Sequence, residues 1–406
     1  MRFSQFLTPI YASLISFIIA AFLGLSMRWA FVVDLPEWYQ YRNVEHAHSH
    51  LALLGWLHAI FLLSIVYFFD LEWKKFAKLY WCLQSAVMGM LFTFPIVGYA
   101  PPSIAFTVIH MILSYVFAYK ILKELRLSGL QGPHILFVKS SLFFMVLSTL
   151  GTWVLGPIMA MGLKGTALYY GSIQFYLHFQ FNGWFIFGLL AIFFAIFRKF
   201  NINFDKRMIS QLFITLMVAT ILTFALAITW STPHFIIFIV NSIGVILQLL
   251  ALYFLYRLIM DKFEAIKSML SQYAFIAFVI AAFALSIKKI IQAIVVIPSI
   301  AQISYTVHNF VIGFIHLLML GCLSLFAFGS ISIIVNQYLS KFGTWIFIFG
   351  IVSTELLLFI QGIMFWQGWG FMPHYYLQLA IGSTFIFLGI INVTAELILK
   401  KASPSL

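Results

Sequence analysis

The chain has 406 residues, of which 63% are hydrophobic and only 8% are charged, and its mean hydropathy is +1.05. A soluble domain needs roughly a quarter of its residues charged to cover its surface, so this composition excludes a soluble globular protein. The formal net charge of +12 comes from cations that are spread over short connections, without a basic face or an aromatic stacking platform. We therefore expect no nucleic-acid partner, and we expect membrane lipid to surround the chain.

Apolar runs of membrane-spanning length follow one another along the whole chain, and a helix needs about 20 such residues to cross the hydrocarbon core. They predict an all-α integral membrane protein with about twelve transmembrane helices in one domain, 1–406. The expected spans are 7–27, 48–69, 79–99, 103–121, 136–160, 172–197, 208–230, 235–257, 270–290, 303–330, 343–364 and 375–398. The ninth is the least regular, because Lys288 and Lys289 interrupt an apolar run that continues to Pro298.

The basic residues predict the orientation. With the N-terminus inside, 18 of the 23 lysines and arginines fall on the inner side. Cytoplasmic loops of membrane proteins are enriched in these residues. We therefore expect both termini in the cytoplasm, in a bacterial-type inner membrane. The five outer cations are Arg28, Arg42, Lys164, Lys288 and Lys289.

The histidines gather at one face. Ionisable side chains are costly in lipid and default to functional hypotheses. Seven of the 11 histidines lie near the outer ends of the expected spans, whereas His134 lies in an inner loop. The seven are His46, His48, His50, His178, His234, His308 and His374.

Three of these histidines begin a repeated phrase, H-x4-G-[WF]. Its copies are His50 with Gly55–Trp56, His178 with Gly183–Trp184, and His308 with Gly313–Phe314. They are 128 and 130 residues apart and fall on the second, sixth and tenth spans. A fixed period of this kind indicates an internal repeat. The repeat predicts three arcs of four helices, each with one histidine at a similar depth.

Imidazole is a common ligand of haem iron and of copper, so the phrase predicts a cofactor site. Two copies carry a further histidine eight residues on, at His58 and His316. His46 and His50 share one helix face and could form a copper site with His178 or His374. His48 points about 200° away from His50, so we do not expect those two to share a metal.

The architecture resembles subunit I of the heme–copper oxidase superfamily, which has twelve spans in three arcs of four. The string from His48 and His50 to Gly55–Trp56 is also similar to an H-x-H…G-W phrase of that superfamily. The resemblance implies a haem, of b type, with His50 and His308 as axial ligands. It makes His58 and His316 further cofactor-binding candidates. It places His178 on a copper-ligand helix, and it leaves His46 and His48 as metal candidates.

The chain departs from the oxidases at three places. The seventh span, 208–230, has no histidine, position 306 is Thr306, and 365–374 has no arginine for haem propionates. These departures predict a divergent member, similar to the NnrS-type membrane proteins, that lacks the full dinuclear centre. If it is an enzyme, it is an oxidoreductase of the oxidase or nitric oxide reductase type.

The function that we expect is electron transfer, or the handling of O2 or NO. No C-x-x-C-H motif is present, so electrons would come from a separate protein or a quinol, and partner subunits are conceivable. The alternative is a proton- or metal-coupled transporter without haem, in which histidines and Glu355 line a path. Lys288 and Lys289 could pair with propionates, although we rather expect them to snorkel to the outer surface. For His110, His234 and His374, a structural bond to a neighbour is the favoured interpretation.

Overall fold

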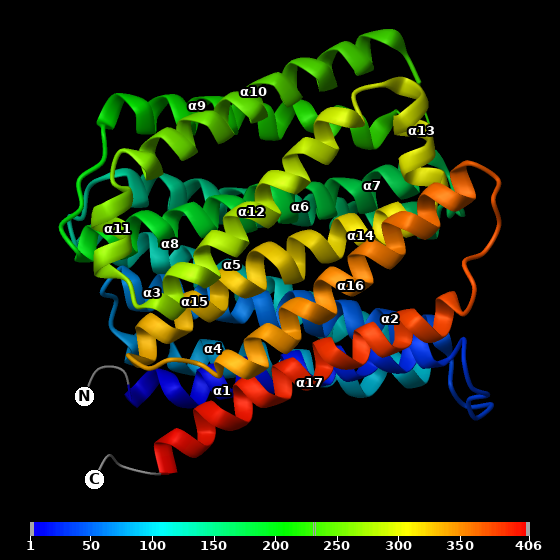
Figure 1. The fold of residues 1–406 in the computed structure, drawn as a ribbon, viewed down its shortest axis with the longest axis horizontal. Helices are drawn as coiled ribbons and strands as arrows, with labels where there is room; N and C mark the ends of the chain where they lie inside the picture. The colour runs from blue at the N-terminus through cyan, green and yellow to red at the C-terminus, as the bar shows by residue number, and fades with distance from the viewer. Residues whose placement is uncertain (1–3, 230, 232, 403–406) are drawn as a thin grey trace. The chain divides into compact units, whose positions relative to one another are not determined.

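The structure is a computed structural model that describes residues 4–229, 231 and 233–402, without the side chains of 400–402 (Figure 1). Over these residues the regular elements are all helices. Twelve helical stretches are long and apolar enough to cross a membrane. The sequence prediction of an all-α integral membrane protein with twelve spans is thus confirmed for the part of the chain described.

Nine of the spans are essentially single helices, and three are interrupted by π-helical segments. The first six are α1 (Ser4–Trp29); α2 (Tyr41–His50), η1 (Leu51–His58) and α3 (Ala59–Phe68); α4 (Trp73–Val97); α5 (Pro101–Leu127); α6 (Pro133–Ala160); and α7 (Ala167–His178), η2 (Phe179–Phe185) and α8 (Ile186–Lys199). The last six are α9 (Lys206–Leu222) with the 3₁₀ turn η3 (Thr223–Ile228); α10 (Phe235–Met260); α12 (Gln272–Ile294); α14 (His308–His316), η4 (Leu317–Ser324) and α15 (Leu325–Val335); α16 (Lys341–Trp366); and α17 (Tyr375–Ala402).

Several span boundaries differ from the sequence prediction by a few residues, and two of the differences concern polar residues. The ninth span, α12, continues unbroken through Lys288 and Lys289 to Ile294. The tenth span begins at His308 instead of 303, because Pro298–Thr306 form a separate helix, α13. A short helix, α11 (Phe263–Met269), connects α10 to α12.

The chain forms two compact units. Unit 1 comprises residues 1–120, 271–284 and 307–406, and unit 2 comprises 121–270 and 285–306. In unit 1, α17 packs against α16 and against α1, which runs antiparallel to it (Figure 1). In unit 2, α6 packs against α7, η2 and α8, and α9 packs against α10. Asp205 caps α9 by accepting a 2.7 Å hydrogen bond from the backbone N–H of Met208.

The three π-helical segments lie on the spans that carry the histidine phrase. A histidine immediately precedes each segment: His50 before η1, His178 before η2 and His316 before η4. These spans are also the most enclosed, with 83%, 94% and 61% of their most apolar window buried, against 28–44% for the other nine. Single π-bulges inside α-helices occur frequently at functional sites. The repeat is therefore present in the backbone as well as in the sequence.

The backbone changes the third copy of the phrase. The sequence interpretation took His308 with Gly313–Phe314 as the third copy. His308, however, begins the α-helix α14 and does not directly precede a π-helical segment, as the corresponding histidines do. His316 stands directly before η4 and is followed five residues later by Gly321, as Gly55 follows His50 and Gly183 follows His178. The structurally equivalent histidines are therefore His50, His178 and His316.

Glycine in each copy admits a neighbouring helix. A Cβ on Gly183 would lie 2.5 Å from the Cβ of Phe144 in α6, and one on Gly55 would lie 2.9 Å from Val87 in α4. A Cβ on Gly321 would lie 3.2 Å from Ala284 in α12. Small residues let helices in membranes approach closely, which explains this part of the phrase.

Gly183→Ala should lower the free energy of unfolding in detergent by about 1–3 kcal/mol, because the added methyl group collides with Phe144. Gly171→Ala is the matched control, since a Cβ at Gly171 of α7 meets no atom within 4 Å. Thermal unfolding of both purified variants measures the difference. Equal stabilities of the two variants would contradict the close approach of α6 and η2.

Candidate cofactor site

His48 is held in a fixed orientation by α1. Its Nδ1 lies 2.7 Å from the backbone carbonyl oxygen of Ala20, and a carbonyl can only accept, so Nδ1 carries the proton and donates it. Nε2 is then the unprotonated nitrogen. Gly24 makes room for the ring, because a Cβ there would lie 2.8 Å from Cε1 of His48. This is the arrangement that orients histidine ligands in metalloproteins, where the second ring nitrogen donates to a carbonyl.

His316 lies at a similar depth in the tenth span, two residues further along the repeat than His48. The second and tenth spans run in the same direction, since η1 contacts η4 and α3 contacts α15 (Figure 1). Trp56 of η1 donates a 2.9 Å hydrogen bond from Nε1 to Oγ of Ser324 in η4. His48 stands eight residues before Trp56, and His316 stands eight residues before Ser324. The two histidines are therefore at the same depth, on the order of 10 Å from that bond.

The charge of Arg28, in the last turn of α1, acts on both histidines. It also acts on the carboxyl group of Glu355 in α16 and on the phenol of Tyr375 in α17. His48 and His316 interact with each other electrostatically as well. One guanidinium thus lies among two imidazoles and a carboxylate within unit 1.

Glu355 is buried, and neither carboxylate oxygen has a hydrogen-bond partner within the described part of the chain. Tyr375 accepts a 2.8 Å hydrogen bond from Nδ2 of Asn309, the residue after His308. Sequence reasoning missed Arg28, which it counted only as an outer cation. Its place in the last turn of an otherwise apolar span was the signal that could have found it.

His46 and His50 share one face of α2, as their spacing predicted. The His50 ring packs 4.4 Å from the Phe94 ring, and the His46 ring packs 4.5 Å from the Tyr99 ring. Nδ1 of His50 donates to the backbone oxygen of His46 at 2.8 Å, and its Nε2 is 3.4 Å from the hydroxyl of Tyr99. Both nitrogens of His50 therefore have partners in the protein. His48 faces α1 instead, which confirms that His48 and His50 point in different directions.

His308 is exposed at the start of α14, and its side chain makes no hydrogen bond to the described residues. His50 and His308 were the axial pair that the resemblance implied. His50 contacts α2, α4 and Tyr99, and it interacts electrostatically with His110. None of these interactions joins it to His308. That pairing stays a prediction, whereas His48 and His316 are near enough to interact electrostatically.

His58, at the end of η1, lies against α5. Its Nε2 is 3.2 Å from Oγ of Ser114, and its ring centroid is 5.2 Å from that of His110. Ser114 donates to the backbone oxygen of His110 at 2.9 Å, so its oxygen is free to accept from His58. His110 Nε2 is buried without a hydrogen-bond partner among the described residues. The structural bond that we expected for His110 can therefore involve only its other ring nitrogen, Nδ1.

His178 in unit 2 uses both nitrogens within the protein. Nε2 donates to the backbone oxygen of Thr220 at 2.8 Å, and Nδ1 is 3.4 Å from Nδ2 of Asn182. Its ring also meets Phe179 and Phe224 edge-on. This environment is that of a structurally satisfied histidine, so His178 would have to give up a hydrogen bond to bind copper.

The expectation that Lys288 and Lys289 snorkel to the outer surface is wrong. They are 0% and 4% exposed in α12. Nζ of Lys288 donates to Oδ1 of Asn182 at 2.7 Å and to Oε1 of Gln292 at 3.1 Å. Polar side chains on η2 and α12 thus draw the ammonium groups inward, which hydropathy could not reveal.

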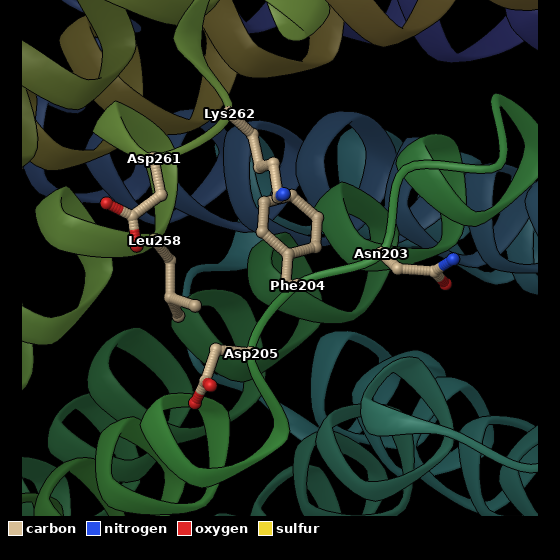
Figure 2. A pocket seen from close by; sticks show the side chains of 6 residues that line it. All are labelled: Asn203, Phe204, Asp205, Leu258, Asp261 and Lys262. Atoms are coloured by element: carbon tan, nitrogen blue, oxygen red, sulfur yellow. The ribbon is translucent and has the colours of Figure 1, made fainter.

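The remaining candidates lie at helix ends. His234 caps α10 by accepting from the backbone N–H of Ile236, a structural role as expected. His374 is exposed, has φ of 54°, and lines an open pocket of about 430 Å³ beside Tyr375. Figure 2 shows a second pocket, of about 340 Å³, at helix ends of unit 2. Its lining residues are Asn203, Phe204, Asp205, Leu258, Asp261 and Lys262.

No group of three or more His, Cys, Asp or Glu within the described residues is arranged to hold a metal ion. A site built on two histidines is not tested by that finding. Comparison with known proteins gives no family: neither a family model nor a curated protein matches the chain.

Ser324→Ala should lower the free energy of unfolding by about 1 kcal/mol, because it leaves the buried indole N–H of Trp56 without an acceptor. In a double-mutant cycle with Trp56→Phe the two effects should not add, since each substitution removes the same bond. Ser330→Ala is the control, because that buried hydroxyl bonds only to Phe326 of its own helix. Strict additivity with Trp56→Phe would show that the bond does not join the second and tenth spans.

Proposed function

We propose that this chain is a haem-binding integral membrane protein in which His48 and His316 would hold the haem iron. The observation that carries the proposal is the similar depth of these two imidazoles on two parallel, enclosed spans that the Trp56–Ser324 hydrogen bond joins, together with their electrostatic interaction. Opposed histidines from two helices suit a six-coordinate haem.

The state of the two rings fits ligation. His48 has Nδ1 engaged by Ala20 and Nε2 unprotonated, which is the form that binds iron. The His316 ring makes no hydrogen bond to the described residues, so a ligand costs it no existing partner. His50 and His178, in contrast, would each have to lose a hydrogen bond. The hydrogen-bond pattern thus distinguishes the ligand pair from its neighbours.

Arg28 fits the carboxylates that every haem carries on its propionate arms. The sequence lacks an arginine in 365–374, the loop where the oxidases often carry a pair of arginines for the haem propionates. Arg28 supplies a guanidinium beside both candidate ligands from a different helix. Guanidinium groups bind carboxylates through two parallel hydrogen bonds. Arg28 would therefore take the part that the missing arginines play.

When bound, haem would supply a one-electron redox centre, and ligation by two histidines favours electron transfer over gas binding. The residues of the chain control the charge around it. Arg28 lowers the cost of negative charge, and Glu355 can hold or release a proton at its carboxylate as that charge changes. Electrons would come from a separate protein or a quinol in a bacterial-type cytoplasmic membrane.

The three π-helical segments support a likeness to the heme–copper oxidases, because a three-fold backbone repeat is what three arcs of four helices require. We place the chain outside the oxygen-reducing enzymes, since the seventh span, α9 with η3, has no histidine. A copper site at His46 remains part of the proposal only with further ligands, because His178 is satisfied within unit 2. A colourless purified protein would favour the alternative function, transport without haem.

His48→Ala and His316→Ala should each abolish the sharp α and Soret bands of a reduced-minus-oxidised spectrum, because each removes an axial ligand. His50→Ala and His308→Ala are the matched controls and should retain the bands. A pyridine haemochrome assay of each purified variant gives the haem content. The reverse pattern would restore His50 and His308 as the ligands, and a colourless wild-type protein after expression with added haem would overturn the proposal.

Arg28→Met should weaken haem binding about 10- to 100-fold, because a charge-assisted hydrogen bond of about 1.5–3 kcal/mol is lost. Arg42→Met is the control, since Arg42 is an exposed cation at the start of α2. Haem titration of the apoprotein, followed by the Soret band, measures both dissociation constants. If the two variants bind haem equally well, Arg28 does not contact the propionates.

A further inference from the structure

The pocket of about 430 Å³ in unit 1 lies where α1 ends and α17 begins. Phe31, just after α1, and Tyr376, in the first turn of α17, both line it, and their rings stack 4.9 Å apart at 11°. The Phe371 ring lies 5.8 Å from that of Tyr376. His374 adds an exposed imidazole to this aromatic lining. A volume of this size falls within the range of about 300–1,000 Å³ that is typical of small-molecule sites.

The loop that lines this pocket is held in one conformation by a buried glutamine. Gln361 of α16 is 0% exposed, and its Nε2 donates to the backbone oxygen of Gly370 at 2.8 Å. Its Oε1 accepts from the backbone N–H of Met372, also at 2.8 Å. His374 has φ of 54°, and residues other than glycine keep such a left-handed backbone where their surroundings enforce it, often at ligand-binding sites. The wall of the pocket is therefore preorganised.

The chemistry of the pocket selects among the ligands that a membrane offers. Among the described residues that line it, none is Lys, Arg, Asp or Glu, so it has no cation for a lipid phosphate. An acyl chain has no polar group that could bond to the imidazole of His374. A flat ring with hydroxyl substituents, in contrast, can pack on Phe31 and Tyr376 and hydrogen-bond to that imidazole. A membrane-soluble quinol has both features.

Arg28 connects the pocket to the proposed haem site. Its charge acts on the phenol of Tyr375, a buried residue that also lines the pocket. The same charge acts on His48 and His316. Along α1, Arg28 stands eight residues after Ala20, which holds His48, so it lies about 12 Å further along the helix axis. The pocket is therefore near the place where haem would accept an electron.

We propose that this pocket binds the ring of a membrane-soluble quinol that donates electrons to the chain, an inference that rests on the haem site proposed above. His374 accepts a hydrogen bond from a quinol hydroxyl, and Phe31 and Tyr376 pack against the ring. One quinol gives one electron to each of two ferric haems, in two protein molecules, which become ferrous. It releases two protons, the first to His374 and the second to water at this end of the spans, and it leaves as the quinone.

The first experiment measures binding of a short-chain benzoquinone and of menadione, a naphthoquinone, by thermal unfolding of the full-length protein in detergent. Neutral imidazole can also donate to the carbonyl of the oxidised ring, so the quinones test the same contacts. At least one quinone should raise the Tm of the wild-type protein by several degrees, and the rise should saturate. Phe31→Ala and His374→Gly should each weaken binding about tenfold, because each loses one contact with the ring.

Two features of these variants keep the binding experiment specific. Glycine adopts the left-handed backbone of position 374 without strain, so His374→Gly removes the imidazole and retains the loop. Trp369→Ala is the matched control and should bind quinone as the wild type does. Trp369 is an exposed aromatic residue of the same loop and does not line the pocket.

The second experiment follows anaerobic reduction of the ferric haem by the matching quinol, from the Soret band in stopped flow. The wild type and Trp369→Ala should be reduced at a rate that saturates with quinol. Phe31→Ala should need about tenfold more quinol for its half-maximal rate, because it loses a contact with the ring. His374→Gly should also have a lower limiting rate at saturation, since its proton acceptor is lost. Dithionite should reduce the haem of all four proteins equally.

Failure of this proposal differs from failure of the haem proposal. A protein whose haem dithionite reduces, but which responds to no quinone or quinol, would overturn the quinol site and leave the haem. A colourless protein whose Tm still rises with quinone would overturn the haem and support the binding site. Unaltered quinol kinetics in both Phe31→Ala and His374→Gly, or haem reduction by soluble ferrocytochrome c alone, would also overturn the quinol site.

Discussion

The whole structure depends on one constraint: within lipid, every backbone N–H and C=O must find its partner inside the same segment. Helices meet that condition, and the described spans are helical throughout. Within the described spans, the only turns wider than those of an α-helix are the π-helical segments η1, η2 and η4. These segments lie on the three most enclosed spans. A π-turn adds a residue to the helix while it keeps backbone bonds internal. It can therefore re-aim a side chain without exposing the backbone to lipid, and a histidine stands before each one.

Tight packing around these segments then fixes the histidines. Trp56 stacks on Phe17 at 4.6 Å with the rings 2° from parallel, and it bonds to Ser324 in the neighbouring span. His48 is locked between Ala20 and Gly24 of α1. The same helix α1 carries Arg28 in its last turn, so one element both orients His48 and carries a charge that acts on it. Preorganised ligands lose little freedom when a cofactor binds, which is why rigid elements favour a site here.

The spans could be predicted because hydropathy and length alone decide them, and the opposite faces of His48 and His50 followed from helical geometry. The third copy of the phrase could not. Gly313–Phe314 follow His308 as the phrase requires, whereas His316 is followed by Gly321 and Cys322, and only the backbone register, which packing sets, selects His316. The burial of Lys288 was equally hidden, because its partners Asn182 and Gln292 become neighbours only in the folded unit. Sequence showed which residues were costly in lipid, and tertiary contacts decided what each one does.

The three copies of the repeat have diverged in a way that hydrogen bonds make visible. In unit 1, the ring of His316 in the third copy makes no hydrogen bond to the described residues, and His48, two residues before the first copy, uses only Nδ1. In unit 2, the second copy engages both nitrogens of His178, with Thr220 and Asn182. Asn182 in turn accepts from Lys288, so the second copy is joined to a buried lysine of α12. The histidines before the three π-helical segments thus differ in their hydrogen bonds within the described part of the chain: those of the first and second copies are engaged at both ring nitrogens, whereas His316 is not.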